Sequence, residues 1–345
     1  MGGCERVCTG TVQLHPTRHC NLRCRHCYSL SGPEERDALP ARLLIDALAD
    51  ARAQGYGRVS FSGGEPMLYR GLQEVLRQAR ALGMLATLTT NGIPLTERRV
   101  ASLAGLVDLI AISLDGRPET HDALRGPHAF DGMQVRLPLL RASGIPFGFI
   151  FTLTRDSMDD LAWVATFAIE SGAALLQVHP LEETGRAAVE TRGQQPDELV
   201  ANAAYLAFMR LQDRVGERIA LQLDLAHRDL IRAEPWRVYA DAEPVPGDLP
   251  LAALVDTLVV ETDGLVVPLQ YGFPRAHALG RLGDAPLAAL GARWRNEGYG
   301  GFRAHCRRVF EESLLDPEAL PAFNWFEALS GRTAGQFSSS LSQYR

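Results

Sequence analysis

The sequence predicts an α/β protein with a mainly parallel sheet, followed by a smaller C-terminal α+β region. In the first half of the chain, short apolar runs alternate with single segments of helical periodicity. Such alternation is typical of parallel strands joined by right-handed helical crossovers. The chain is 345 residues long and 46% hydrophobic. This length can form one large α/β unit with an appendage, or two domains.

Six strands with helices between them are expected in the first part of the chain. The strands are expected at residues 11–15, 58–62, 84–90, 108–113, 145–152 and 174–179. The helices are expected at residues 40–54, 72–79, 96–104, 132–142 and 157–171. In the first helix, for example, the apolar residues Leu43, Leu44, Ala47, Leu48 and Ala51 recur at helical spacing. Residues 187–196 are then expected to form a loop, and 197–215 an amphipathic helix.

The C-terminal region is expected to contain a β-hairpin and a helix at 286–294. Apolar runs at 258–262 and 265–268 flank Asp263-Gly264. This dipeptide suits a type I′ turn, in which both central residues need a positive φ. Several prolines between residues 235 and 250 indicate a linker. The expected division is an N-terminal arm at 1–10, the repeating α/β unit at 11–235 and a C-terminal domain at 236–345.

Three of the six cysteines, Cys20, Cys24 and Cys27, are spaced Cys-x3-Cys-x2-Cys. Thiolates are soft ligands that select zinc or iron–sulfur clusters. A closed zinc site needs four ligands, and no second Cys-x2-Cys pair lies nearby. A cubane cluster held by three thiolates keeps one iron free to bind another molecule. From the spacing alone, a small zinc knuckle or reduced surface thiols remain alternatives.

Composition excludes several other classes of protein. There is no lysine, so all 35 basic residues are arginine, which rules out a Walker A lysine, a kinase lysine and a Schiff-base lysine. The formal net charge of −6 argues against a general nucleic-acid binder. No apolar run approaches the length of a membrane span, and the first residues lack the apolar core of a signal peptide. The cysteine usage indicates a reducing cytoplasm.

Three later segments follow expected strands and, with the cysteines, resemble the radical SAM superfamily. They are Gly63-Gly64-Glu65-Pro66, Asn91-Gly92, and Ser113-Leu114-Asp115-Gly116 with Arg125. The resemblance implies a partial (β/α)6 TIM-type barrel, in which functional residues lie on loops at the carboxyl ends of the strands. It also implies that the three cysteines hold a 4Fe-4S cluster. The free iron of that cluster would bind the amino and carboxylate groups of S-adenosylmethionine.

The resemblance further assigns residues to S-adenosylmethionine. Glu65 would pair with the ammonium group, and Ser113 and Asp115 would lie near the ribose. Arg125 would approach the methionine carboxylate, which suits a planar guanidinium, and Leu181 would pack on the adenine. The full expected set is Tyr28, Gly63, Gly64, Glu65, Pro66, Asn91, Ser113, Asp115, Arg125 and Leu181. From the residues alone, these loops could equally be ordinary turns, and Arg125 a solvated surface charge.

The C-terminal hairpin resembles SPASM and twitch domains. In those domains a cluster-ligating cysteine follows the hairpin's proline, whereas here Leu269 follows Pro268. We therefore expect a SPASM- or twitch-like domain without its auxiliary cluster. Cys306 lies among charged residues and is expected to be exposed, with a lowered pKa. It could donate a hydrogen atom to a substrate radical, form a second metal site with Cys4 and Cys8, or be an incidental thiol.

The resemblance implies an enzyme that cleaves S-adenosylmethionine reductively and uses the 5′-deoxyadenosyl radical to abstract hydrogen from a substrate carbon. The electron would come from a reductant such as flavodoxin or ferredoxin. The SPASM-type branch favours a ribosomally synthesised peptide as the substrate. Because the barrel begins near residue 11, binding of a leader peptide would then have to be improvised by this chain or handled by a partner protein. The alternatives are a small molecule in cofactor or natural-product biosynthesis, and a non-catalytic iron–sulfur sensing or binding module.

Overall fold

The computed structural model describes residues 10–242, 247, 249–316 and 318–331, and its centre is one sheet of ten strands. The strand order is β11-β10-β9-β1-β2-β3-β4-β5-β6-β7. Pairs from β9 through β1 to β7 are parallel, and the β9–β10 and β10–β11 pairs are antiparallel. The strands are β1 (Gly10–Leu14), β2 (Tyr56–Phe61), β3 (Leu85–Thr90), β4 (Leu109–Ser113), β5 (Phe147–Leu153), β6 (Leu175–Pro180), β7 (Ala220–Leu223), β9 (Thr257–Val260), β10 (Leu265–Pro268) and β11 (Gly280–Arg281). Among the described strands the sheet stays open, with β7 and β11 as its edges.

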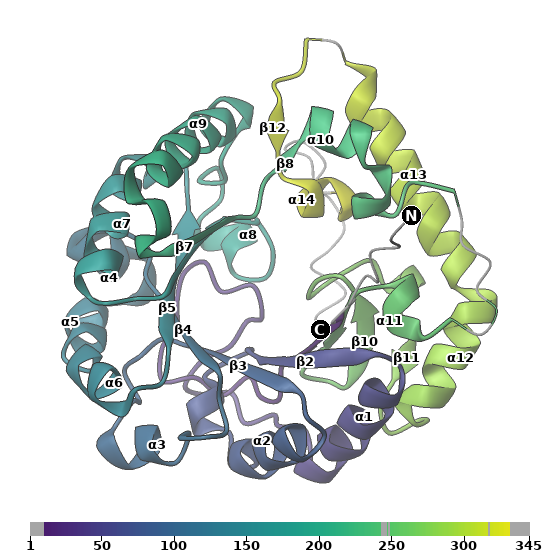
Figure 1. Cartoon of the computed structure of the whole chain (residues 1–345), viewed down its shortest axis with the longest axis horizontal. Helices are drawn as coiled ribbons and strands as arrows, with labels where there is room; N and C mark the ends of the chain where they lie inside the picture. Colours follow the sequence, from purple (N-terminus) through teal and green to yellow (C-terminus); the bar gives the residue numbers. More distant parts are fainter. Residues whose placement is uncertain (1–9, 243–246, 248, 317, 332–345) are drawn as a thin grey trace.

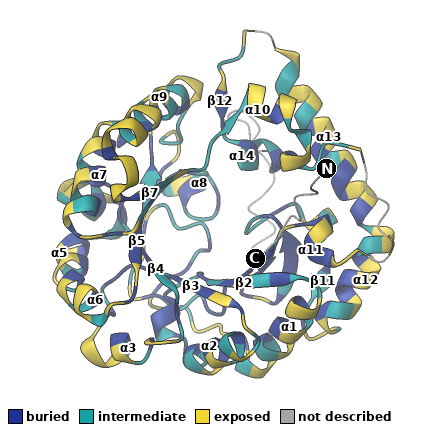
Figure 2. Cartoon of the chain, in the orientation of Figure 1, coloured by how far each residue is buried: buried dark blue, intermediate teal, exposed yellow. Residues whose placement is uncertain are grey.

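Helices cover the outer side of this curved sheet, and the loop after β1 lies on the inner side (Figure 1). The helices of the repeating unit are α1 (Ala41–Ala53), α2 (Leu72–Ala81), α3 (Glu97–Ala101), α4 (Pro118–Arg125), α5 (Ala129–Gln134), α6 (Leu137–Ser143), α7 (Leu161–Glu170), α8 (Ala187–Glu190) and α9 (Glu198–Val215). The later elements are α10 (Arg228–Ala233), α11 (Leu251–Leu254), α12 (Leu287–Glu297), α13 (Tyr299–Leu315) and α14 (Trp325–Leu329), with a small antiparallel pair of β8 (Ala226–His227) and β12 (Ala322–Phe323). Figure 2 shows exposed residues mainly on the outward faces of the helices. The arrangement is the open, partial barrel that the sequence predicts.

Hydrophobic periodicity explains most of these elements. The predicted stripe on α1 is buried except for Leu43, which is half-buried, and Gly55 with φ 92° follows the end of the helix. All six predicted strands form. The helix expected at 132–142 is instead divided into α5 and α6, because Pro138 occupies the first turn of α6 and cannot continue a helix from α5. The strand β7 and the helices α4 and α13 were not predicted, and α8 lies inside the stretch expected to be a loop.

The C-terminal hairpin extends the sheet of the first part of the chain. β9 lies parallel to β1, with Val12 opposite Leu258 in register. The Tyr56 hydroxyl, fully buried, donates to the Val255 carbonyl across this seam at 2.8 Å. The buried apolar residues of both parts also form one cluster. The boundary expected at residues 235–236 therefore coincides with no break in the sheet or the core, and the domain division stays a prediction.

The hairpin turn differs from the predicted type I′. Gly264 N–H donates to the Glu261 carbonyl at 2.8 Å, and Gly264 has φ 83°. Asp263 does not have the positive φ that a type I′ turn requires. Its side chain instead accepts from Leu265 N–H at 3.0 Å. This local hydrogen bond stabilises an ordinary turn at Asp263 and leaves the left-handed position to the glycine.

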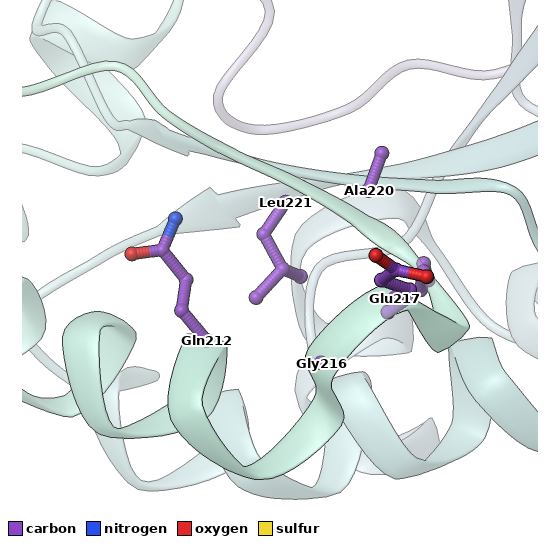
Figure 3. A pocket seen from close by; sticks show the side chains of 6 residues that line it. Gln212, Gly216, Glu217, Ala220 and Leu221 are labelled. Atoms are coloured by element: carbon purple, nitrogen blue, oxygen red, sulfur yellow. The ribbon is translucent and has the colours of Figure 1, made fainter.

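Two surface hollows of the described chain lie away from the loops that the sequence singles out. One of about 490 Å³ lies at the amino end of β7, lined by residues such as Gln212, Glu217 and Leu221 (Figure 3). The predicted site residues follow the opposite, carboxyl ends of the strands. Within the described residues, no helix is both long enough and apolar enough to span a membrane.

Replacing Tyr56 by phenylalanine should lower the free energy of unfolding by about 1 kcal/mol, because the buried Val255 carbonyl loses its donor. Urea unfolding followed by circular dichroism measures the change. Tyr205→Phe is the control, because no hydrogen bond of its hydroxyl is recorded in the described structure. Equal stability of the Tyr56→Phe protein and the wild type would contradict this account of the seam.

Candidate active site

The predicted site residues meet at the carboxyl edge of the sheet. The cysteine loop, residues 15–40, follows β1, and the Gly-Gly-Glu-Pro segment follows β2. Asn91 follows β3, and Asp115 follows β4. Parallel strands bring these four connections to one edge, so the architecture gathers side chains that are far apart in sequence.

The loop after β2 packs directly on the cysteine loop. Gly64 N–H donates to the Thr17 carbonyl at 2.8 Å, and Glu65 N–H to the His19 carbonyl at 2.9 Å. A Cβ atom at Gly64 would collide with the His19 carbonyl, and Gly63 has φ 107°. The two glycines are therefore needed for a close approach of two backbone segments. Their expected contact with a ligand stays a prediction.

The three loop cysteines are free thiols, and donors surround their sulfur atoms. Cys20 and Cys24 are buried, and Cys27 is half-buried. Leu22 N–H donates to Cys20 Sγ at 3.4 Å, and Ser31 N–H donates to Cys27 Sγ at 3.3 Å. Such donors stabilise negative charge on sulfur, which is the state in which thiolates bind metal.

Burial sets the protonation of the free thiols. It raises the pKa of Cys20 to about 12 and that of Cys24 to about 11, although the nearby Arg125 guanidinium opposes the rise at Cys24. At neutral pH the free thiols are therefore protonated. Metal binding would then release protons from these sulfurs.

A buried ion pair lies beside Cys24. The Asp115 side chain is fully buried, and Arg125 Nε lies 2.5 Å from its Oδ2 atom. Burial opposes both charges, but Arg125 holds the pKa of Asp115 below its usual range, and Asp115 raises that of Arg125. Arg125 Nη1 also lies 3.9 Å from Cys24 Sγ. The pair thus fixes a positive charge next to a cysteine sulfur, and the expected contacts of both residues with the nucleotide stay predictions.

His26 belongs to the same cluster and was not assigned a role from the sequence. Its Nε2 lies 3.4 Å from Asp115 Oδ2, and its buried Nδ1 has no hydrogen-bond partner among the described residues. Burial lowers the pKa of His26 to about 4, so the ring is neutral at pH 7. The signal that the sequence offered was the position of His26 between Cys24 and Cys27.

Glu65 is held by protein donors. Its Oε1 accepts from Met67 N–H at 3.0 Å and from Thr90 Oγ1 at 2.8 Å, while Oε2 accepts from Asn91 N–H at 2.9 Å. The residue is fully buried, and burial raises its pKa. The carboxylate therefore joins the loop after β2 to the end of β3. This observed role differs from the expected pairing with an ammonium group, which remains untested.

The other expected cofactor contacts occupy different positions. Asn91 Nδ2 donates to Asn21 at 2.9 Å and lies 3.9 Å from Cys20 Sγ. The Tyr28 hydroxyl lies 2.9 Å from Ser62 Oγ. Pro66 starts a 3-10 helix, Ser113 is half-buried at the end of β4, and Leu181 is buried after β6. Of these, Asn91 lies nearest to the cysteine sulfurs in the recorded contacts.

Arg186, in the loop after β6, holds the cysteine loop from the other side. Its Nη1 donates to the Cys24 carbonyl at 2.7 Å and its Nη2 to the Ser31 carbonyl at 2.9 Å. Its backbone N–H donates to the Cys27 carbonyl at 2.9 Å. The sequence shows only a Gly-Arg-Ala run here, without a role for the arginine. One side chain therefore fixes backbone on both sides of Cys27.

Comparison with known families identifies this arrangement. A family model described as the radical SAM superfamily matches residues 14–168. This segment is therefore identified as a radical SAM domain, similar to the radical SAM superfamily of enzymes. The matched segment contains the cysteine loop and the loops after β2, β3 and β4 described above. The family uses a 4Fe-4S cluster and S-adenosylmethionine.

The cysteine loop fits such a cluster. It supplies three thiols with N–H donors and a nearby fixed cation, and Cys20, Cys24 and Cys27 are the residues that would hold it. In the described part of the chain, no three His, Cys, Asp or Glu side chains are arranged to hold a single metal ion.

Curated relatives carry names from haem biosynthesis. An AdoMet-dependent heme synthase of Oleidesulfovibrio alaskensis is 34% identical over 180 residues, 50% of this chain and 45% of that protein. An Fe-coproporphyrin III synthase of Methanosarcina barkeri is 36% identical over 157 residues, 44% of this chain and 38% of that protein. A pre-heme d1 synthase of Dinoroseobacter shibae is 31% identical over 202 residues, 56% and 49% respectively. The matched segments thus span less than half the length of these relatives.

Solved structures confirm the fold. Streptococcus suis SuiB bound to S-adenosylmethionine has a TM-score of 0.67 at 19% identity, covering 86% of this chain and 68% of SuiB. The anSMEcpe structure with bound AdoMet and Cp18Cys peptide has a TM-score of 0.65 at 16% identity, covering 93% and 87% respectively. At these identities the likeness concerns the partial barrel fold alone.

The expectation that Cys306 is exposed with a lowered pKa is wrong. It lies on α13 with Phe302 and Val309, which recur at helical spacing on the buried face. The residue is 0% exposed, and burial raises its pKa to about 12. The charged neighbours in sequence occupy other faces of the helix, and its proposed hydrogen-donor role stays untested. Cys4 and Cys8 lie outside the described residues.

Replacing Asp115 by asparagine should lower the free energy of unfolding by about 3–5 kcal/mol, because Arg125 is left buried without its partner. Since the folded-state pKa of Asp115 is lowered, this stabilisation is present above about pH 4 and is lost as pH falls through that lowered pKa. Urea unfolding at several pH values measures both effects. Asp46→Asn, at a pair with exposed side chains, should cost about 1 kcal/mol or less. Similar losses in the two variants would contradict the prediction.

Replacing Arg186 by lysine should weaken iron retention about tenfold, because lysine cannot hold two carbonyl groups at once. The measurement is the loss of visible absorption when anaerobically reconstituted protein meets a chelator. Arg23→Lys, in the cysteine loop itself, is the control, since Arg23 is exposed and binds only Glu190 in the recorded contacts. Equal iron retention by the wild type and Arg186→Lys would show that the contacts of Arg186 with the Cys24 and Ser31 carbonyl groups are unimportant for the cluster.

Proposed function

We propose that this protein is a radical SAM enzyme that acts on a small molecule in cofactor biosynthesis, with a haem-related tetrapyrrole as the substrate class. The observation that carries the proposal is the 31–36% identity to relatives named as heme, Fe-coproporphyrin III and pre-heme d1 synthases. The sequence analysis instead favoured a peptide as the substrate and gave a small molecule as the alternative. The relatives' names support the small-molecule alternative more directly.

The described residues have definite parts in such a reaction. Cys20, Cys24 and Cys27 would hold the cluster, which together with S-adenosylmethionine supplies a 5′-deoxyadenosyl radical. The Asp115–Arg125 pair keeps a positive charge beside Cys24. Hydrogen bonds join the loops after β1, β2 and β3 around the thiols. The protein would thus hold its cofactors in position.

Peptide modification is the second candidate, and its support is weaker. It depends on the likeness of the C-terminal hairpin to SPASM and twitch domains. The structures of SuiB and anSMEcpe, which were solved with peptides, are similar to this chain only in fold. The sequence also has no cysteine after Pro268 at the expected ligand position, so this likeness lacks its defining metal ligand.

The test is release of 5′-deoxyadenosine from anaerobically reconstituted, reduced protein, measured by liquid chromatography and mass spectrometry. Iron-coproporphyrin III should stimulate release above the substrate-free rate and should itself change in mass. A variant with all three loop cysteines replaced by alanine is the control and should release none.

Each other outcome contradicts a defined part of the proposal. Stimulation by a precursor peptide but by no tetrapyrrole would favour peptide modification. A normal cluster spectrum without any cleavage of S-adenosylmethionine would favour the non-catalytic module.

A further inference from the structure

A second polar cluster occupies the carboxyl ends of β6 and β7, apart from the expected cofactor contacts. His179 Nδ1 lies 2.9 Å from Asp224 Oδ2. The Asp224 side chain is 13% exposed, whereas that of His179 is 41% exposed. The carboxylate is therefore enclosed, while the imidazole that it holds reaches open space.

Two amides fix the orientation of the carboxylate. Gln177 Nε2 donates to Asp224 Oδ2 at 2.6 Å, and Gln222 Nε2 donates to Oδ1 at 2.8 Å. The backbone N–H of Asp224 also donates to the Val178 carbonyl in the sheet. With Nδ1 of His179 directed at Asp224, the Nε2 atom on the far side of the ring has no partner among the recorded contacts of the described chain.

The charges around this imidazole favour its protonated form. Burial opposes the charge, but Asp224 and Glu182 together raise the pKa of His179. Burial also disfavours ionised Asp224, yet His179, Gln222 and Gln177 hold the pKa of that carboxyl below its usual value. In its protonated form the imidazole donates Nδ1–H to Asp224 and presents a second, charged N–H donor at Nε2.

The cluster lies on the inner face of the sheet. Along β6, Leu176 and Val178 are buried, while Gln177 and His179 alternate with them and are only half-buried. Because α7 covers the outer face of β6, the alternating residues face the inner side, where the cysteine loop also lies (Figure 1). Six residues after His179, the same connection reaches the cysteine loop. A molecule held beside the cofactors on this face would meet His179.

We propose that His179, oriented by Asp224, binds a carboxylate group of the substrate through Nε2. This inference rests on the proposed function, because the tetrapyrroles in the relatives' names carry carboxylate side chains. A purely structural ion pair at the β6–β7 edge would need neither two amides around the carboxylate nor an imidazole directed to open space. The proposed subsite accounts for both features.

The test is a fluorescence titration of anaerobically reconstituted protein, with S-adenosylmethionine present, using metal-free coproporphyrin III as the probe. His179→Gln should weaken binding about tenfold or more, the usual effect of losing a charge-assisted hydrogen bond. Wild-type binding should weaken as pH rises through the pKa of His179, and His179→Gln should lack this step. His128→Asn is the control for an exposed histidine and should bind as the wild type does, with the same iron content.

Asp224→Asn keeps the shape of the cluster and should move the pH step to lower values, since it removes the main group that raises the pKa of His179. If His179→Gln melts at a much lower temperature than the wild type, its weaker binding could reflect misfolding, and Asp224→Asn then tests the inference instead. Wild-type affinity in His179→Gln, or an unchanged pH step in either variant, would overturn the subsite and leave the proposed function standing. Failure of the wild type to bind the probe would overturn the proposed function and this inference with it.

Discussion

The site depends on the backbone contacts that hold the cysteine loop at the carboxyl edge of the sheet. Gly64 and Glu65 bind one side of the loop through their N–H groups, and Arg186 binds the other through its side chain. A flexible loop of this length would lose much conformational entropy on binding a cluster through three thiols. Because these contacts already order the loop when the protein folds, less entropy is lost on binding. Two glycines are required because no side chain fits between the two backbone segments.

Buried charge is the second constraint on this site. Asp115 and Arg125 lie in one cluster with His26 and Cys24, and each charge is acceptable there only because the other is present. A cluster held by three thiolates adds negative charge to the same place, and the guanidinium is suitably positioned to compensate it. The pair therefore links the stability of the fold to the electrostatics of the site.

The open sheet also places substrate recognition. The C-terminal hairpin extends the sheet by pairing β9 with β1, so that β11 and β7 are the edges among the described strands. The connections after β6 and β7 carry Arg186 toward the cysteine loop and His179 with Asp224 toward the inner face. The loops with most of the expected cofactor contacts follow β1 to β4, and the proposed substrate contact follows β6 and β7 of the same sheet. This arrangement agrees with a cofactor domain whose substrate specificity comes from later segments.

Sequence patterns were sufficient for the α/β class, the six strands of the repeating unit, the cysteine triad and the family. These features depend on patterns among residues that are close together in sequence, such as the helical stripe of α1 and the Cys-x3-Cys-x2-Cys run. The burial of Cys306 was mispredicted because its charged neighbours in sequence lie on other faces of α13.

The pairing of β9 with β1, the clamp by Arg186 and the His179–Asp224 contact were decided only by the tertiary structure. Each joins residues at least 45 positions apart in sequence. No local pattern specifies such a contact, because it forms only when the parallel strands bring their carboxyl ends to one edge.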